Sequence, residues 1–280
     1  MARLNLAEKL IVVNLLIFIA PLILRTFFFL FKAELPDFIS WFEINSDLKE
    51  FIIKPWTLIT YSFFHGDFWH IFWNMIVLYY FSRIFFNLFE ARRFINIYFL
   101  GVITGGFAFL ACYNLFPVFE THNKMIGASA GVNAILIFVC TYLPNKEFRI
   151  FSFGIKLWYI GLFLLIKDFI GIAGPNSGGA IAHLGGAALG FLLARNLLKG
   201  KDSGEWFSKL VDSFTSLFSV KKRTPLKTVH KTKTKKATKK QPKTVDQQKI
   251  DAILDKISKS GYESLTKQEK DFLFQAGKDN

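Results

Sequence analysis

Apolar and polar positions divide the chain at about residue 198. Before that point, six long apolar runs alternate with short polar breaks, and most runs approach the ~20 residues that an α-helix needs to cross a bilayer. We therefore expect residues 1–198 to form an all-α, polytopic membrane domain with six transmembrane helices. The runs are residues 10–31, 68–88, 94–116, 127–143, 151–173 and 179–198.

The chain is more polar after residue 198. Residues 199–220 carry apolar side chains at helical spacing on one face, which predicts an amphipathic helix lying in the membrane interface. Residues 221–245 consist mostly of Lys and Thr. They lack the apolar content needed to fold, so we expect a basic disordered linker there.

An apolar pattern returns in residues 246–280. It predicts a small helical hairpin whose helices, residues 246–258 and 265–276, are joined at Gly261. The string Thr266-x-x-Glu269 is a capping box that opens the second helix. We expect this cytoplasmic tail to bind a partner or the membrane domain.

The charge pattern sets the expected orientation. The chain holds 35 Lys and Arg against 21 Asp and Glu, a net charge of +14, although 52% of its residues are hydrophobic. Short cytoplasmic loops carry the excess of Lys and Arg, and here basic residues follow the second and fourth runs and fill the tail. We therefore expect both termini in the cytoplasm and the acidic first loop outside. The basic loop residues are Arg92, Arg93, Lys146 and Arg149.

Both cysteines, Cys112 and Cys140, fall inside apolar runs. There they behave as small hydrophobic residues and predict neither a disulfide framework nor a metal site. We expect no metal and no organic cofactor.

Four polar residues stand near the starts of the second, fourth and sixth runs, all of which enter the membrane from the outer face in this topology. They are His70, Asn74, Ser129 and His183. A helix rises about 1.5 Å per residue, so all four lie within roughly two turns of a helix start. We expect them to converge just below the outer surface.

The chemistry of these residues fits nucleophilic catalysis. A serine hydroxyl becomes a useful nucleophile when a base lies beside it, and His183 is the candidate base for Ser129. His70 and Asn74 are four residues apart, hence on one helix face, where both can donate to one oxygen. The short fourth run places Ser129 at a helix N-terminus, whose unpaired N–H groups are further donors for an oxyanion.

Glycines spaced four apart accompany two of these residues. Such pairs allow helix backbones to approach closely, so we expect the fourth and sixth spans to pack through them and to bring Ser129 near His183. The packing glycines are Gly127, Gly131, Gly186 and Gly190.

These residues resemble the motifs of the rhomboid family of intramembrane serine proteases, over roughly residues 10–198. The tail is similar to that of some bacterial rhomboid-like proteins. The motif strings are His70-Ile71-Phe72-Trp73-Asn74, Gly127-Ala128-Ser129 and Ala182-His183-Leu184-Gly185-Gly186, the last followed by Gly190.

The resemblance implies a catalytic dyad without an aspartate. Ser129 would be the nucleophile and His183 the general base, while His70, Asn74 and the Ser129 N–H would form the oxyanion hole. Glu90 looks like a structural glutamate of the family. The implied activity is endopeptidase cleavage of transmembrane segments of other membrane proteins, which enter past the fifth span. The implied location is a bacterial inner membrane, with the active site near the outer face.

The chain departs from the family pattern at two positions. Trp56 is followed by Thr57 where many members have arginine, which alters that loop anchor. Asn133 stands four residues after Ser129, where the family usually has an aromatic residue that stacks on the histidine. How His183 is held is therefore open, and a hydrogen bond from Asn133 is one possibility.

Lys167 and Asp168 are adjacent within the fifth run. We expect Asp168 to pair locally or to shape a polar interior, and we assign it no catalytic role.

Other interpretations stay open. Gly-x-Ser-x-Gly also occurs in helix seams of small residues, and an intramembrane histidine can be a structural hydrogen-bond partner. A catalytically inactive relative that binds transmembrane clients is the main alternative, although such proteins usually lose the serine or the histidine. A transporter predicts charged residues near the midplane, whereas this polar set lies near one face.

The lysine-rich segment has two open readings, as a site for anionic lipid headgroups or as a solvated linker. Nucleic-acid binding is not expected, because no aromatic residues interleave the lysines.

Overall fold

The computed structural model describes residues 4–119, 122–150, 153–218 and 245–276. Contacts divide the chain into two compact units, Met1–Ser219 and Val220–Asn280. Residues 221–244 of the expected basic linker lie outside the described residues.

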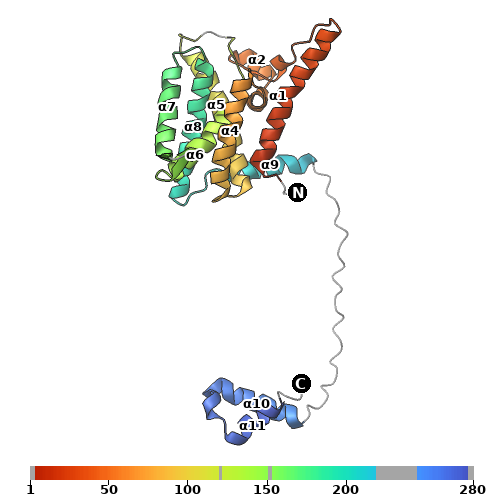
Figure 1. The fold of residues 1–280 in the computed structure, drawn as a ribbon, viewed down its shortest axis with the longest axis vertical. Helices are drawn as coiled ribbons and strands as arrows, with labels where there is room; N and C mark the ends of the chain where they lie inside the picture. Colours follow the sequence, from red (N-terminus) through yellow and green to blue (C-terminus); the bar gives the residue numbers. More distant parts are fainter. Residues whose placement is uncertain (1–3, 120–121, 151–152, 219–244, 277–280) are drawn as a thin grey trace. The chain divides into compact units, whose positions relative to one another are not determined.

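The first unit is built from helices (Figure 1). The long ones are α1 (Leu6–Leu30), α4 (Phe68–Phe86), α5 (Ala91–Leu115), α6 (Ser129–Tyr142), α7 (Leu157–Gly171), α8 (Ser177–Leu198) and α9 (Glu205–Phe218). Shorter helical segments are η1 (Ile39–Trp41), α2 (Leu48–Ile53), α3 (Thr57–Thr60) and η2 (Tyr61–Phe63). Two antiparallel pairs of short strands, β1 (Ile44–Asn45) with β2 (Lys124–Met125) and β3 (Glu147–Ile150) with β4 (Phe153–Lys156), complete it.

Three of the described helices, α1, α5 and α8, are long and apolar enough to cross a membrane, and α6 is apolar but shorter. The polar side chains of His70, Asn74 and Arg83 lower the hydropathy of α4. Helix α7 has only 15 residues. The count of six transmembrane helices therefore stays a prediction.

The fifth apolar run begins differently from the expectation. Instead of a helix from residue 151, the chain forms the β3–β4 hairpin, in which Phe148 pairs with Ile155 and Arg149 with Gly154. Charged and apolar residues alternate along β3, which is the period of a strand. The helix begins only at Leu157.

Helices α5, α6 and α8 form a tightly packed centre. Most residues of α6 are buried. A Cβ atom built at Gly186 would overlap the backbone carbonyl of Ala130, and one at Gly190 would overlap that of Ala134. Gly105 of α5 likewise faces the Ala182 carbonyl oxygen, 2.8 Å from an ideal Cβ position. Only glycine permits these backbone approaches.

Alanine at Gly186 is expected to destabilise the membrane domain. The added methyl meets a backbone carbonyl that cannot rotate away, so the loss reaches about 1–3 kcal/mol or more. Thermal unfolding in detergent measures it. Gly171→Ala is the matched control, because its methyl meets only the Ala180 Cβ at an ordinary 3.4 Å. Equal midpoints for the two variants would contradict this packing.

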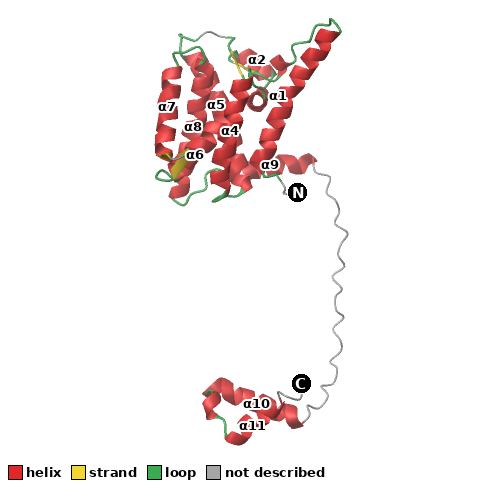
Figure 2. Ribbon diagram, in the orientation of Figure 1, coloured by secondary structure: helices red, strands yellow, loops and turns green. Residues whose placement is uncertain are grey.

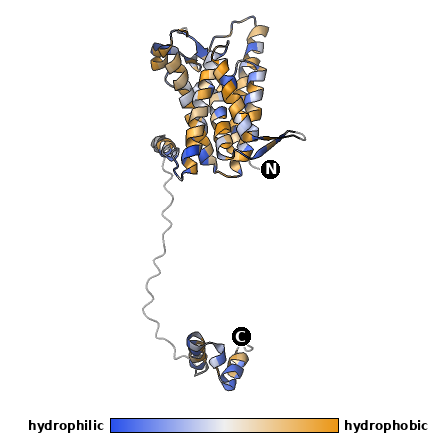
Figure 3. Ribbon diagram, turned by 90° about the vertical axis from the view of Figure 1, so that its left-hand side faces the viewer, coloured by the Kyte–Doolittle hydropathy of each residue, from blue (hydrophilic) through white to orange (hydrophobic). Residues whose placement is uncertain are grey.

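Helices α1 and α7 flank this centre on opposite sides (Figure 1). Both present large apolar side chains outward, such as Ile23 at 63% and Phe169 at 70% exposure. Hydrophobic colouring dominates the long helices of this unit (Figure 3). Such an apolar exterior suits contact with lipid.

The basic segments gather at one end of the first unit. The β3–β4 hairpin and α9 lie at this end, and β1–β2 lies at the other (Figure 2). Asn96 of α5 fixes the start of α9, because its Nδ2 donates to the Gly204 carbonyl at 3.0 Å and its Oδ1 accepts from Ser208 at 2.8 Å. Arg93 pairs with Asp202 at 2.6 Å. In α9 itself Phe207 is buried.

The second unit is a helical hairpin of α10 (Val245–Ser260), η3 (Tyr262–Ser264) and α11 (Lys267–Ala276). Gly261 makes the turn with a φ of +78°. The capping box is confirmed: Thr266 N–H donates to Glu269 Oε2 at 2.8 Å, and Glu269 N–H donates to Thr266 Oγ1 at 3.4 Å. Lys256 of α10 reaches both Glu269 oxygens at 2.9 Å, which ties the two helices together.

We expect this hairpin to lose helix in acid. The Thr266 N–H, followed by Lys256, lowers the pKa of Glu269 from 4.5 to about 2. A lowered carboxyl pKa contributes stability that is present above pH 4.5 and lost as the pH falls towards 2. Circular dichroism of a peptide of residues 245–276 measures this. Glu269→Gln should show less helix at pH 7 and a flatter profile, and a profile identical to the wild type would contradict the assignment.

Candidate active site

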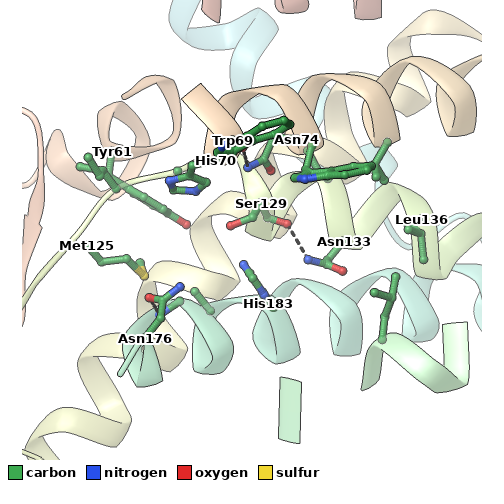
Figure 4. A pocket seen from close by; sticks show the side chains of 18 of the residues that line it. Tyr61, Trp69, His70, Asn74, Met125, Ser129, Asn133, Leu136, Asn176 and His183 are labelled. Carbon is green, nitrogen blue, oxygen red and sulfur yellow. Dashed lines mark hydrogen bonds between the residues drawn. The ribbon is translucent and has the colours of Figure 1, made fainter. Parts of the chain in front are cut away.

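A cavity of about 570 Å³ opens between the starts of α4, α6 and α8. His70 and Asn74 of α4, Ser129 of α6 and His183 of α8 all line it. Figure 4 shows Ser129 between His70 and Asn74 on one side and His183 on the other. The four polar residues picked from the sequence thus share one cavity.

Ser129 is the first residue of α6. The turn before it needs glycine, because Gly127 has a φ of +135°. Two hydrogen bonds fix this turn: Gly127 N–H donates to the Tyr61 carbonyl at 2.9 Å, and Ala128 N–H donates to His65 Nε2 at 3.4 Å. The first N–H groups of a helix have no intrahelical acceptor, so Ser129 stands beside free backbone donors.

The His70 ring points its Nε2 towards the serine. Gly66 N–H donates to His70 Nδ1 at 3.4 Å, so the neutral ring carries its proton on Nε2. A Cβ atom built at Gly127 would lie 2.7 Å from His70 Nε2 and 3.5 Å from Ser129 Oγ. Because Gly127 has no Cβ, the space between the Nε2–H of His70 and the Oγ of Ser129 stays open.

Two asparagines in the cavity bond back to their own helices. Asn74 Nδ2 donates to the His70 carbonyl at 2.8 Å, and Asn133 Nδ2 donates to the Ser129 carbonyl at 3.0 Å. Each Nδ2 keeps a second N–H. No hydrogen bond joins Asn133 to His183 among the described residues, so the asparagine does not hold the histidine in this state.

His183 is held from α7 instead. Its Nδ1 lies 2.9 Å from Asp168 Oδ1, and Lys167 Nζ lies 2.9 Å from the same oxygen. Asp168 is only 4% exposed. It does pair with its neighbour Lys167, as the sequence suggested, but its contact with His183 was missed. The sequence signal for this contact was the pair of ionisable residues in an apolar run. Ionisable side chains are costly to bury in a membrane and are by default read as functional.

Ser129 Oγ and His183 are not hydrogen-bonded to each other among the described residues. The His183 side chain points towards Ser129 (Figure 4), and catalytic hydrogen bonds are often long before substrate binds. With Nδ1 directed at Asp168, the Nε2 of His183 is the nitrogen left to act on the serine.

The four packing glycines have different positions. Gly186 and Gly190 form the close seam between α8 and α6 described above. Gly131 faces α5 instead, 2.8 Å from the Tyr98 ring at an ideal Cβ position. Gly127 lies before α6, beside His70, and shapes the cavity rather than a helix seam.

Thr57 and Glu90 lie away from the cavity. Thr57 is buried and donates to the Lys54 carbonyl at 2.7 Å. Glu90 is the residue before α5, at the end of the unit that carries α9. Among the described residues, no group of three or more His, Cys, Asp or Glu side chains could hold a metal ion.

Comparisons with known proteins match both units. The family model of the Rhomboid domain matches residues 53–200, more than half of the chain. A family of unknown function (DUF6576) matches residues 235–277. Among curated proteins, RHOMBOID-like protein 12, mitochondrial, from Arabidopsis thaliana is 30% identical over 158 residues. That match covers 52% of this chain and 47% of the relative, so the chain spans about half the length of the relative.

Proposed function

This chain belongs to the rhomboid family, and from that premise we propose that it is an intramembrane serine endopeptidase that cleaves transmembrane segments of other membrane proteins. The family match and the apolar helices make it an integral membrane protein. The observation that carries the proposal is the shared cavity of Ser129, His183, His70 and Asn74. A hydroxyl, an imidazole base and side-chain donors together are the groups that acyl transfer needs.

The first half of the reaction forms an acyl-enzyme. Ser129 Oγ attacks the scissile carbonyl carbon while its proton passes to His183 Nε2. The carbonyl oxygen becomes an oxyanion, which the Nε2–H of His70, the Asn74 amide and the Ser129 N–H stabilise. As the C–N bond breaks, His183 returns the proton to the leaving amine.

The second half releases the product. A water molecule attacks the acyl carbon and gives a proton to His183 Nε2, and the oxyanion forms again in the same hole. When the ester bond breaks, the proton returns to Ser129 Oγ. No metal and no organic cofactor takes part in this scheme.

The proposed membrane placement has six spans, with both termini in the cytoplasm of a bacterium and the cavity near the outer face of the inner membrane. The positions of the basic loops support it. The start of α5, which carries Arg92 and Arg93, and the β3–β4 hairpin lie at the end that carries α9, opposite the starts of α4, α6 and α8 (Figure 2). The excess of basic residues marks the cytoplasmic side. The lysine-rich segment, outside the described residues, would then face anionic lipid headgroups.

A cleavage assay tests the proposed function. The purified protein in detergent is incubated with a single-span reporter that has a helix-breaking, small-residue segment, and mass spectrometry locates the cut. A reporter with a uniform leucine span is the control and should stay intact. In parallel, a fluorophosphonate should label Ser129.

Cleavage inside the span together with a Ser129 adduct supports the protease. A chain that neither cuts nor becomes labelled would instead be an inactive relative that binds transmembrane clients.

A further inference from the structure

A buried carboxylate contacts the proposed catalytic base from another helix. Asp168 lies near the end of α7, and His183 lies in the second turn of α8. The 2.9 Å separation of Oδ1 and Nδ1 is a hydrogen bond, and the two side chains are only 6% and 16% exposed. The contact is therefore shielded from solvent and does not belong to a loose surface pair.

We propose that Asp168 is a positioning residue for His183, which fixes the imidazole with Nε2 towards Ser129 and stabilises the imidazolium formed during catalysis. The proposal rests on the proposed protease function. The proposal adds an acidic residue to the pair of Ser129 and His183. Asp168 thereby makes the contact with His183 that Asn133 does not make.

The charge of Asp168 sets the tautomer of His183. An ionised carboxylate only accepts hydrogen bonds, so Nδ1 must carry the proton and Nε2 must present its lone pair. The ammonium of Lys167, 2.9 Å from the same oxygen, compensates the buried negative charge. The Lys167 side chain is half exposed and lines the same cavity as His183.

The proton balance needs no transfer to Asp168. When Ser129 Oγ bonds to the carbonyl carbon, its proton moves to His183 Nε2 and the ring becomes cationic. The Nδ1 proton stays on His183 and remains donated to Asp168 Oδ1. The positive ring then lies against a negative carboxylate, which lowers the energy of the charged intermediate.

The test compares Asp168→Asn with the wild type in the cleavage assay. The amide of asparagine can donate to Nδ1, which moves the ring proton to Nε2 and removes the base. We expect kcat to fall on the order of 10³-fold, with KM unchanged and with the unfolding temperature close to that of the wild type. The matched control is Asp47→Asn, the cap of α2 outside the cavity, which should keep full activity.

A second measurement is decisive on the wild-type protein alone, whether or not the variant folds. In protein labelled with ¹⁵N-histidine, the wild-type His183 should show the proton on Nδ1 at neutral pH, and Asp168→Asn should show it on Nε2. Wild-type His183 with its proton on Nε2 would overturn the proposal. So would an Asp168→Asn variant with wild-type kcat.

These outcomes are separable from failure of the proposed function. If the protein cuts the reporter only with Ser129 present but Asp168→Asn is fully active, the protease stands and the positioning role falls. If neither cleavage nor fluorophosphonate labelling occurs, the function falls. The ¹⁵N spectrum then still decides whether Asp168 sets the His183 tautomer.

Discussion

Alanine at Ser129 is expected to lower the rate of reporter cleavage by on the order of 10⁴-fold or more. The substitution removes the oxygen that forms the acyl bond and leaves no other hydroxyl at the first residue of α6. Alanine adds no bulk and breaks no hydrogen bond of the Ser129 Oγ among the described residues, so the variant should unfold as the wild type does. Cleavage rate and unfolding temperature, measured on the same preparation, check both statements.

The control for this change is Ser82→Ala. Ser82 is a buried helical serine, which donates to the Tyr79 carbonyl at 2.9 Å and lies outside the cavity. The Ser82→Ala variant should cleave the reporter at the wild-type rate. His183→Ala should lose about as much activity as Ser129→Ala, and the double variant no more than either, because residues that act as a unit are not additive. Cleavage by Ser129→Ala near the wild-type rate would exclude Ser129 as the nucleophile.

Alanine at His70 is expected to reduce kcat by about 10²–10³-fold, which is the usual effect of losing one oxyanion donor. The physical reason is that the Nε2–H of His70 points into the space beside Ser129, and its loss leaves only the Asn74 amide and the Ser129 N–H as donors in the proposed oxyanion hole. Fluorophosphonate labelling should slow as well, because the phosphonyl oxygen occupies the same hole. Cleavage kinetics and labelling rates together measure the effect.

Asn74→Ala should act in the same direction but less strongly, since its Nδ2 already donates to the His70 carbonyl at 2.8 Å. His122→Ala is the matched histidine control. Its ring lies outside the cavity, 3.5 Å from Asp47, and its loss should leave kcat unchanged. A His70→Ala variant as active as His122→Ala would exclude His70 from the oxyanion hole.

The convergence of the polar residues was predictable because it depends only on helix starts. His70, Ser129 and His183 each follow a polar break by a few residues, and a constant rise per residue places them at one depth. The family motifs in the same strings pointed to the fold. The short fourth run also predicted Ser129 at a helix N-terminus, and α6 begins at this residue.

The contact between Asp168 and His183 was not predictable in this way. The contact depends on the position of α7 along α8, which the turn of residues 172–176 sets. The periodicity of apolar residues in either helix does not encode this position. The β3–β4 hairpin was missed because an apolar run reads alike as a strand or a buried helix segment. Gly131 was assigned to the wrong neighbour, since spacing alone shows that a glycine approaches some helix but not which one.

The contact between Asp168 and His183 joins a peripheral helix to the packed centre of the membrane domain. The Asp168 carboxylate moves with α7, a helix whose apolar side chains face outward, whereas His183 belongs to the tightly packed centre of α5, α6 and α8. Under the proposed function, a substrate that enters past α7 meets the helix that carries Asp168 before it reaches Ser129, and any shift of α7 against α8 lengthens the contact between Asp168 and His183. The alignment of the proposed base therefore depends on how α7 packs against α8, and not on the packed centre of α5, α6 and α8 alone.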